Sequence, residues 1–363
     1  MRLLHLVGSP TDDFHAELSL VYARGALASL QEGTDHEHVV AFVAPDGLWR
    51  LPDRPALDDA TLGSTEPVEL ATALRRVREV GIDAALPQMF CRAGMTHYRA
   101  LLDVLDLPYL GNDPATMALG ADKARARAVV AAAGVPVPEG AVVRVGDPRP
   151  VFARPGSGGS GDVVVKPVDA DNSAGVTLVR GGEPDAAYVA AVAAACRDDG
   201  SGRALVERYV PLGREVRCGV LATREGLVAL PLEEYAVDEA ASPVRLADSK
   251  LARDGAGDLG LVAKDVTRAW IVPADDPVVP AVHEAALAAY DALGCRHYGL
   301  FDLRIDPEGR PWFLEAGLYC SYAPTSVVAT MARAAGIDLP ALLQHGLDRL
   351  GLPAPAHSLG GTA

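Results

Sequence analysis

The 363-residue sequence has few cysteines and no long hydrophobic run. Its five cysteines are scattered and form no C-x-x-C pair, so we expect neither a disulfide framework nor a zinc cluster, and the default compartment is a reducing, cytoplasmic one. The longest apolar run, Ala186 to Cys196, falls well short of the roughly 20 residues that a membrane span needs. A signal peptide is not expected either, because Gly8 and Pro10 interrupt the short apolar start.

Basic residues are also in the minority, with 33 against 48 acidic ones and a net charge of −15. A generic basic surface for nucleic acid or for an anionic membrane is therefore not expected. Hydrophobic residues make up 49% of the chain, which is ample for a sizeable core. At roughly 150 residues per domain, the length predicts two to three folding units.

Lysine is scarcer than any other charged residue, and arginine supplies almost all of the basic side chains. The lysines are Lys123, Lys166, Lys250 and Lys264. This composition suggests a genome-wide bias that replaces lysine wherever arginine serves as well. The lysines that remain are then enriched at places where a compact ammonium group is needed, although chance survival is an equal alternative for any one of them.

The first part of the chain alternates between strand-like and helix-like segments. Strands are expected at Leu3–Val7, Val39–Val43 and Ala84–Pro87, and helices at Ala16–Leu30, Val68–Val80 and Tyr98–Leu105. This alternation predicts an α/β unit with a parallel sheet covered by helices. We place its end at 113, so that the first domain spans 1–113.

The rest of the chain predicts a mixture of helices and strands. One Ala-rich helix is expected over Pro114 to Ala133, where Gly134 stops it. Further helices are expected at Asp185–Cys196, Val278–Leu293, Thr325–Ala335 and Leu339–Leu350. Strands are expected at Val142–Val145, Val163–Lys166, Val176–Val179, Leu205–Val210 and Val216–Ala222, and a hairpin at Gly299–Ile305 with Trp312–Leu314.

A glycine-rich segment, Gly156 to Gly161, matches the pattern G-x-G-x-x-G. A dinucleotide-binding fingerprint has to follow a strand and open a helix, whereas this segment precedes a strand. We therefore interpret it as a flexible loop. Such a loop can still fold over phosphates, because its backbone N–H groups are accessible.

Polar side chains interrupt several of the predicted strands. Lys166 ends one strand before the short polar loop Asp171 to Gly175, and a lysine beside such a loop can hold the phosphates of a nucleotide. Glu207 and Glu215 lie in the next two strands. For each feature the alternative is an ordinary solvated surface position.

Two carboxylates, Asp302 and Glu315, lie on the two strands of the predicted hairpin. If they meet across the hairpin, they form a site for Mg²⁺, which prefers oxygen ligands and bridges phosphates. Two separately exposed acids are the alternative.

The order and spacing of these features resemble the ATP-grasp superfamily, and within it the D-alanine–D-alanine ligase family. Leu107 to Gly111 (LPYLG) and Ala121 to Lys123 (ADK) are similar to the family's "lPYtG … mDK" stretch. The segment from Glu315 to Gly336 aligns without gaps to a family segment that begins E-x-N. The resemblance implies an ATP-grasp fold of class α/β, with an N-terminal parallel-sheet domain and ATP bound between two further units. These are a small central α+β domain over 114–206 and a C-terminal α+β catalytic domain over 207–352, followed by a tail over 353–363.

The resemblance also implies roles for individual residues. Lys123 and Lys166 would bind the ATP phosphates, under the small loop that holds Asn172, Ser173 and Gly175. Glu207, with the backbone of Tyr209 and Val210, would bind adenine, and Glu215 would bind the ribose hydroxyls. Asp302 and Glu315 would hold one or two Mg²⁺ ions, Ser326 would contact a substrate carboxylate, and Lys250 would lie in a mobile active-site loop.

The sequence departs from the family at positions that serve the chemical step. The family's metal-binding Asn is Gly317 here, and its arginine before the metal-binding Asp is Leu300. Arg304 shares a strand face with Asp302 by spacing and is our candidate for the missing arginine.

It also departs at positions that recognise the amino acids. The family's Pro-Gly after E-x-N is Cys320-Ser321, and its H-G-x-x-G-E-D-G segment is replaced by Met89 to Thr96. The glutamate that binds the first D-alanine is replaced by His15, next to a retained E-x-S-L pattern that begins at Glu17. The predicted substrate-binding residues are His15, Glu17, Ser321 and Ser326.

The predicted activity is an ATP-dependent carboxylate–amine ligation. A carboxylate is phosphorylated by ATP, an amine attacks the acyl phosphate, and ADP and phosphate are released. Retained nucleotide residues and changed recognition residues favour a different pair of small-molecule substrates, in specialised metabolism. The alternatives are a genuine D-alanine–D-alanine ligase and an ATP-binding protein without ligase activity. The family's habit also implies a homodimer, and neither a nucleic acid nor a membrane is an expected partner.

Overall fold

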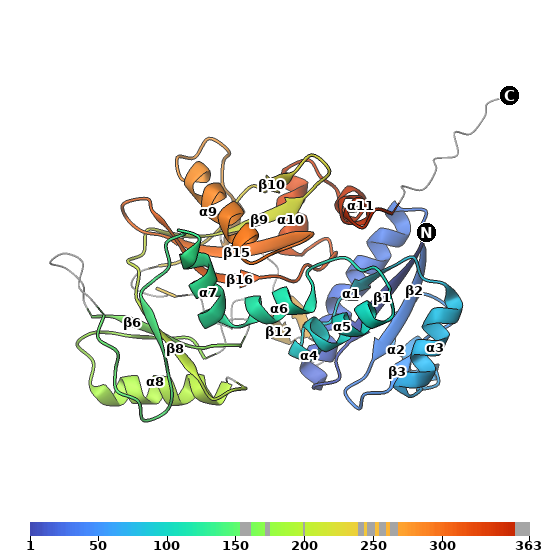
Figure 1. Ribbon diagram of the computed structural model, residues 1–363, viewed down its shortest axis with the longest axis horizontal. Helices are drawn as coiled ribbons and strands as arrows, with labels where there is room; N and C mark the ends of the chain where they lie inside the picture. The colour runs from blue at the N-terminus through green and yellow to red at the C-terminus, as the bar shows by residue number, and fades with distance from the viewer. Residues whose placement is uncertain are drawn as a thin grey trace.

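The computed structural model describes residues 1–152, 161–170, 175–198, 200–238, 243–244, 251–253, 259–261 and 268–352. Three of its sheets form the body of the molecule, and Figure 1 shows them as an N-terminal unit at one end, a central sheet at the other end, and a C-terminal sheet that spans between them. Within these residues, no helix is long and apolar enough to cross a membrane.

The N-terminal sheet has the strand order β3-β2-β1-β4. Its strands β1 (Arg2–Gly8), β2 (Glu37–Val43) and β4 (Ala84–Pro87) are parallel, and β3 (Trp49–Arg50) is an antiparallel edge. Its helices are α1 (Asp13–Gly33), α2 (Asp59–Ser64), α3 (Leu70–Val80), α4 (Arg92–Met95) and α5 (His97–Val104). The predicted parallel sheet with covering helices is therefore confirmed.

The central sheet is antiparallel, with the strand order β5-β8-β6-β7. Its strands are β5 (Gly140–Val143), β6 (Val163–Pro167), β7 (Thr177–Val179) and β8 (Ala204–Arg208). Helix α8 (Asp185–Asp198) packs apolar residues such as Tyr188 and Val192 against one face of this sheet. The opposite face is left for the site described below.

The C-terminal sheet has the order β14-β11-β9-β15-β16, and β10 pairs with β9. Its strands are β9 (Arg214–Ala222), β10 (Leu227–Ala229), β11 (Glu233–Tyr235), β14 (Ala269–Ile271), β15 (Tyr298–Ile305) and β16 (Pro311–Gly317). The helices that follow in this part of the chain are α9 (Val279–Ala292), α10 (Val327–Ala334) and α11 (Leu339–Arg349). Strands β15 and β16 form the predicted hairpin.

Alternate residues of β15 face opposite sides of this sheet. Phe301 and Leu303 join a core with α9 on one side. On the other side, Tyr298 and Leu300 pack in a core with α10 and α11, and the following residues on that face, Asp302 and Arg304, are polar. One face of a single strand thus changes from core to site along its length.

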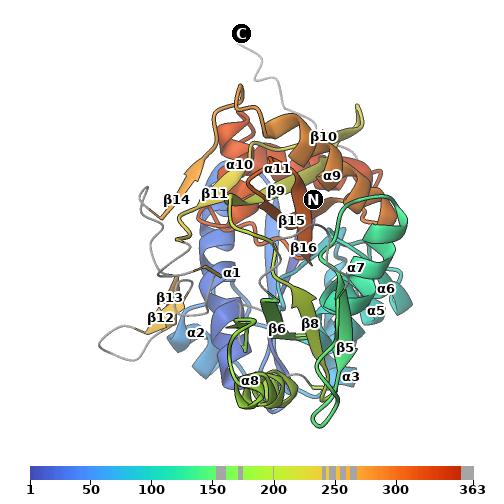
Figure 2. The same cartoon turned by 90° about the vertical axis from the view of Figure 1, so that its left-hand side faces the viewer.

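A short pair of strands, β12 (Leu251–Arg253) and β13 (Leu259–Leu261), forms a separate sheet. Figure 2 shows this pair beside α1 of the N-terminal unit, and β13 contacts that helix. The C-terminal part of the chain therefore reaches back to the first unit.

The single helix predicted over Pro114 to Ala133 is wrong, because two helices are present. Helix α6 (Pro114–Ala121) ends and α7 (Lys123–Ala132) begins at Asp122, whose backbone is extended with φ −94° and ψ 97°. The Asp122 carboxylate accepts a hydrogen bond from the N–H of Arg125 at 3.0 Å and so caps α7. Both helices pack into the core of the C-terminal sheet, although they precede the central sheet in sequence.

Candidate functional site

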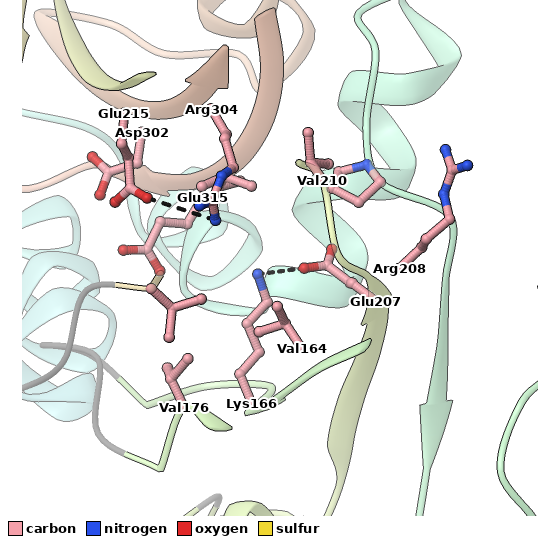
Figure 3. A pocket seen from close by; sticks show the side chains of 13 residues that line it. Val164, Lys166, Val176, Glu207, Arg208, Val210, Glu215, Asp302, Arg304 and Glu315 are labelled. Carbon is pink, nitrogen blue, oxygen red and sulfur yellow. Dashed lines mark ion pairs between the residues drawn. The ribbon is translucent and has the colours of Figure 1, made fainter. Parts of the chain in front are cut away.

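An open pocket lies between the central and C-terminal sheets, with side chains from both sheets on its walls. Figure 3 shows these residues converging from β6 and β8 on one side and from β9, β15 and β16 on the other. The polar lining residues are Lys166, Glu207, Arg208, Glu215, Asp302, Arg304 and Glu315. Of the residues predicted for nucleotide and metal, the structure therefore brings Lys166, Val210, both glutamates and both metal carboxylates together.

Glu207 is paired with two cations at the central-sheet wall. The Nζ of Lys166 lies 2.6 Å from one carboxylate oxygen of Glu207, and the Nε of Arg127 lies 3.0 Å from the other. Lys166 and Glu207 are opposite in charge and both buried, with 7% and 3% of their surfaces exposed. A buried pair of this kind holds both side chains in fixed positions, since separating them would leave an uncompensated charge.

Lys123 is the first residue of α7 and lies where the two sheets approach each other. Its Nζ donates a hydrogen bond to the carbonyl of Ala170 and is 3.5 Å from the carboxylate of Glu315. Its backbone N–H donates to the carbonyl of Val168 at 2.9 Å. Lys123 therefore joins the start of α7 to the segment after β6 and brings a positive charge close to Glu315.

The two predicted metal ligands are paired across the hairpin. Asp302 on β15 is directly opposite Glu315 on β16, just before a register shift between Asp302 and Leu303. Among the described residues, no group of three or more His, Cys, Asp and Glu side chains could hold a metal ion. Two carboxylates suffice for Mg²⁺ when substrate phosphates and water supply the remaining oxygens, so the donor set fits.

A guanidinium group lies directly beside this carboxylate pair. Arg217 on β9 donates from Nε and Nη2 to the two oxygens of Asp302, the second bond being 2.9 Å long. The sequence pattern alone did not indicate this residue. The available signal was its position two residues after Glu215, which puts both side chains on one face of the strand.

Glu215, Tyr209 and Arg304 meet at the other end of the pocket. The Nη2 of Arg304 donates to the hydroxyl of Tyr209 at 3.2 Å and to the carbonyl of Pro243 at 2.6 Å, and its guanidinium lies 4.7 Å from the centre of the Tyr209 ring. Its Nη1 is 4.0 Å from Glu215. Arg304 does share the face of Asp302, as predicted, but it is Arg217 that binds the Asp302 carboxylate.

Arg127 is a second functional candidate that was not predicted from the sequence. It lies four residues after Lys123 on α7, so both side chains project from one face of the helix. Besides its ion pair with Glu207, its Nη2 donates to the carbonyl of Pro138. The i, i+4 spacing of two cations near the predicted phosphate lysine was the signal that could have found it.

The predicted substrate residues do not line this pocket. His15 lies in the first turn of α1, and its Nδ1 is 2.8 Å from the carboxylate of Asp12. Ser326 caps α10, accepting a 3.4 Å hydrogen bond from Ala329 and donating one of 2.6 Å to the carbonyl of Ser321. Glu17, also on α1, is partly exposed.

The thiol next to Ser321 is unsuited to act as a nucleophile. Burial raises the pKa of Cys320 to about 12, so the thiol stays protonated at neutral pH. Cys320 lies in the core that contains Tyr298 and Leu300, and it is not among the residues that line the pocket described above.

Three predicted residues, Asn172, Ser173 and Lys250, lie outside the described residues, as does the glycine-rich segment up to Ser160. Gly175, at the end of the predicted small loop, has a φ of +65°, which favours glycine.

Comparison with known proteins decides the family. The model of the D-ala D-ala ligase C-terminus matches residues 162–347. A D-alanine–D-alanine ligase of Gloeobacter violaceus is 30% identical over 357 residues, which cover 96% of this chain and 99% of that one. The chain belongs to the D-alanine–D-alanine ligase family. Members of this family are ATP- and Mg²⁺-dependent ligases that form a C–N bond and release ADP.

Solved structures confirm the ATP-grasp fold of this ligase-family chain. The D-alanine–D-alanine ligase of Coxiella burnetii superposes with a TM-score of 0.73 at 20% identity, with 96% of each chain covered. The VanG D-Ala:D-Ser ligase of Enterococcus faecalis gives a TM-score of 0.70 at 20% identity, covering 97% of this chain and 98% of that one. At this level of identity the likeness extends to the fold alone.

Proposed function

We propose that this D-alanine–D-alanine ligase-like enzyme joins an amino-acid-type carboxylate to an amine, and that at least one of its two substrates is not D-alanine. The observation that carries the proposal is the contrast within the site. The cations and carboxylates of the nucleotide pocket have the order expected of the family, whereas Leu300 replaces an arginine that serves the family's chemical step and His15 replaces a glutamate that binds its first amino acid.

The proposed reaction has two steps. A carboxylate oxygen of the acid substrate forms a bond to the γ-phosphorus of ATP, the bond between that phosphorus and the β,γ-bridging oxygen breaks, and ADP leaves. The amine nitrogen then forms a bond to the carbonyl carbon of the acyl phosphate. The C–O bond to phosphate breaks, phosphate leaves with the bonding electrons, and the nitrogen loses a proton to give an amide.

In this proposal the nucleotide is held by residues of both sheets. Lys123 and Lys166 contact the phosphates, and their charges offset the negative charge of the transferred group. Glu207 and the backbone of Tyr209 and Val210 bind adenine. Glu207 is held in place by its ion pairs with Lys166 and Arg127, which fixes the base-binding end of the pocket.

The ribose end and the metal end are assigned to the C-terminal sheet. Glu215 accepts hydrogen bonds from the ribose hydroxyls. Arg304 holds Glu215 and Tyr209 in position through its ion pair with the first and its hydrogen bond to the second. Asp302 and Glu315 would hold Mg²⁺, which supplies positive charge at the phosphates.

The acid and amine substrates are assigned to the side of the site that faces α1 and α10. His15, Glu17, Ser321 and Ser326 are the proposed recognition residues there, with Lys250 assigned to a closing loop. At this position a single carboxylate of the family is replaced by an imidazole whose Nδ1 lies 2.8 Å from the carboxylate of Asp12.

A genuine D-alanine–D-alanine ligase is the second candidate. It is favoured by the 30% identity to the Gloeobacter violaceus enzyme, which extends over 96% of this chain. A nucleotide-binding protein without ligase activity is a third candidate, motivated by Leu300 and Gly317.

Product analysis separates these three candidates. Purified protein is incubated with ATP, Mg²⁺ and separate pools of D-, L- and β-amino acids, and ADP, AMP, phosphate and new amides are resolved by chromatography and mass spectrometry. We expect ADP and phosphate in equal amounts with an amide other than D-alanyl-D-alanine. D-alanyl-D-alanine as the sole product would establish the second candidate instead. ATP binding with no amide from any pool would favour the third, and AMP with pyrophosphate would overturn the proposed mechanism.

Two further expectations belong to this proposal. The enzyme works in the cytoplasm, in line with its five free cysteines. It forms a homodimer through the first unit, and light scattering coupled to size-exclusion chromatography measures whether the mass in solution is twice that of the chain.

A further inference from the structure

Arg217 lies in the middle of a row of charged side chains that crosses the C-terminal sheet. Glu233 on β11 is paired in register with Arg217, Arg217 with Asp302, and Asp302 with Glu315. The side chains of paired residues project on the same side of a sheet. Arg217 is therefore a positive charge flanked by carboxylates on the neighbouring strands.

The guanidinium is held rigidly and still presents one nitrogen. Both oxygens of Asp302 accept from Nε and Nη2, and the ring centre of Tyr235 lies 5.4 Å away. The third nitrogen, Nη1, makes no hydrogen bond to any residue that the structure describes. The side chain is 15% exposed, so a ligand can reach it.

Arg217 on β9 and Glu315 on β16 lie on opposite sides of Asp302, which is on the strand between them. Arg217 is not among the residues that line the nucleotide pocket, whereas Asp302 is. Burial raises the pKa of Tyr22 on α1, and the charge of Arg217 lowers it in part. Arg217 thus lies beside the metal carboxylates, where its charge also acts on the helix that carries the proposed substrate residues.

The guanidinium group of arginine stays protonated throughout the physiological pH range. Arg217 is therefore a permanent cation, unable to exchange a proton during turnover.

We infer that Arg217 is a catalytic residue of the ligase, a fixed cation that contacts the acyl phosphate and the tetrahedral intermediate and takes the place of a second metal ion at Asp302. The inference rests on the proposed function. Because both oxygens of Asp302 are already bonded to Arg217, this carboxylate has limited capacity for metal, and one Mg²⁺ per active site follows.

The contribution to the reaction is electrostatic. When the amine attacks, the carbonyl π electrons move to oxygen, and an N–H of Arg217 donates a hydrogen bond to the oxygen that becomes negative. The same N–H group binds the leaving phosphate as the C–O bond breaks, and no proton leaves the guanidinium. Removing one such donor typically costs about 10²–10³-fold in kcat.

The test uses three variants of the full chain. Arg217→Met removes the charge and keeps most of the side-chain length. Arg217→Lys keeps a positive charge but cannot make the bidentate contact with Asp302. Arg214→Met is the matched control, because Arg214 lies on the same strand three residues earlier and pairs instead with Glu234 and Asp276. Circular dichroism first establishes that each variant is folded.

Two measurements are made on each variant. The first is the kcat of amide formation, with the KM for ATP. The second is Mn²⁺ binding in the presence of ADP, followed by electron paramagnetic resonance, which requires neither amino-acid substrate nor turnover. Both are compared with the wild-type chain.

We expect Arg217→Met to lose about 10²–10³-fold in kcat with little change in the KM for ATP. Its Mn²⁺ binding should tighten about tenfold, or rise from one ion to two, because a positive charge next to two carboxylates is gone. Arg217→Lys should be intermediate in kcat, and Arg214→Met should match the wild type in both measurements.

Replacing a residue with a purely structural role would lower both turnover and metal affinity. A lower kcat together with tighter Mn²⁺ binding therefore identifies Arg217 as the fixed cation. Unchanged kcat in Arg217→Met, or unchanged or weaker Mn²⁺ binding, would overturn the inference and leave the ligase function intact. If the wild-type chain binds no Mn²⁺ with ADP, the proposed function itself fails, and the inference with it.

Discussion

Asn112 joins the first unit to the C-terminal sheet, and its replacement should destabilise the whole chain. Its side chain is fully buried, and it is one of the two asparagines in the sequence. Its Nδ2 donates to the carbonyls of Tyr298 at 3.0 Å and Leu318 at 2.9 Å, and its Oδ1 accepts from the N–H of Arg296 at 2.7 Å.

The magnitude follows from the three backbone groups that an alanine would leave without a partner. Each buried, unsatisfied polar group costs about 1–3 kcal/mol, and water entering the space recovers part of this. We therefore expect Asn112→Ala to lower the free energy of unfolding by about 3–5 kcal/mol. Asn112→Asp should cost at least as much at pH 8, because it turns a carboxylate oxygen toward two carbonyl oxygens.

The assay is urea unfolding followed by tryptophan fluorescence, with Thr116→Val as the matched control. The hydroxyl of Thr116 donates to the carbonyl of Gly294 at 3.2 Å, a neighbouring contact between the same two regions. Its loss should cost about 1 kcal/mol. If Asn112→Ala lowers the free energy of unfolding no more than Thr116→Val does, the three buried partners of Asn112 do not stabilise the chain as expected.

Three further predictions concern ATP turnover, pH and packing. Lys166→Ala should abolish ATP turnover with an unchanged circular dichroism spectrum, and full activity would rule out the assigned phosphate site. Burial lowers the pKa of His297 from 6.5 to about 4, so the unfolded chain binds more protons between these values. The free energy of unfolding should then fall by about 2 kcal/mol from pH 7 to pH 5. His297→Gln should remove this part of the pH dependence, measured by denaturant titration at each pH. Gly120→Ala should cost about 1–3 kcal/mol in urea unfolding, because a Cβ there would lie 2.4 Å from Cδ1 of Leu318. Gly63→Ala, in a helix with nothing within 4 Å, should instead be neutral or stabilising by up to about 1 kcal/mol.

The regular elements with strong periodicity were predictable from the sequence. Strand β4 lies at the predicted residues, α9 is one residue shorter than predicted at each end, and α11 begins at the predicted residue and ends one residue early. The hairpin of β15 and β16 was predictable because a turn, Asp306 to Gly309, separates two apolar strands. Its register then places Asp302 opposite Glu315, which was the basis of the predicted metal pair.

Features that depend on tertiary contacts were not predictable. Strands β10, β11 and β14 have three residues each, too few for a period to emerge, and pairing with longer neighbours determines them. The break at Asp122 is a helix cap inside an alanine-rich stretch, and helix propensity there favours continuation.

In the candidate site, too, some features were predictable from the sequence and others depend on tertiary contacts. Lys166 and Glu207 could be found from strand context, but their ion pair follows from the register of β6 against β8. Arg217 was missed since an arginine within a strand is usually a solvated edge residue. Only the pairing of β9 with β15 places it on Asp302.

The two lysines predicted for one role have different mechanical positions. Lys166 belongs to the central sheet, whereas Lys123 begins a helix whose apolar residues pack in the C-terminal core. Through the carbonyls of Val168 and Ala170, Lys123 also holds the segment that leaves β6. Lys123 thus connects the central sheet to the C-terminal core, whereas Lys166 belongs to the central sheet alone. The distance between their ammonium groups therefore depends on how the two sheets are placed relative to each other.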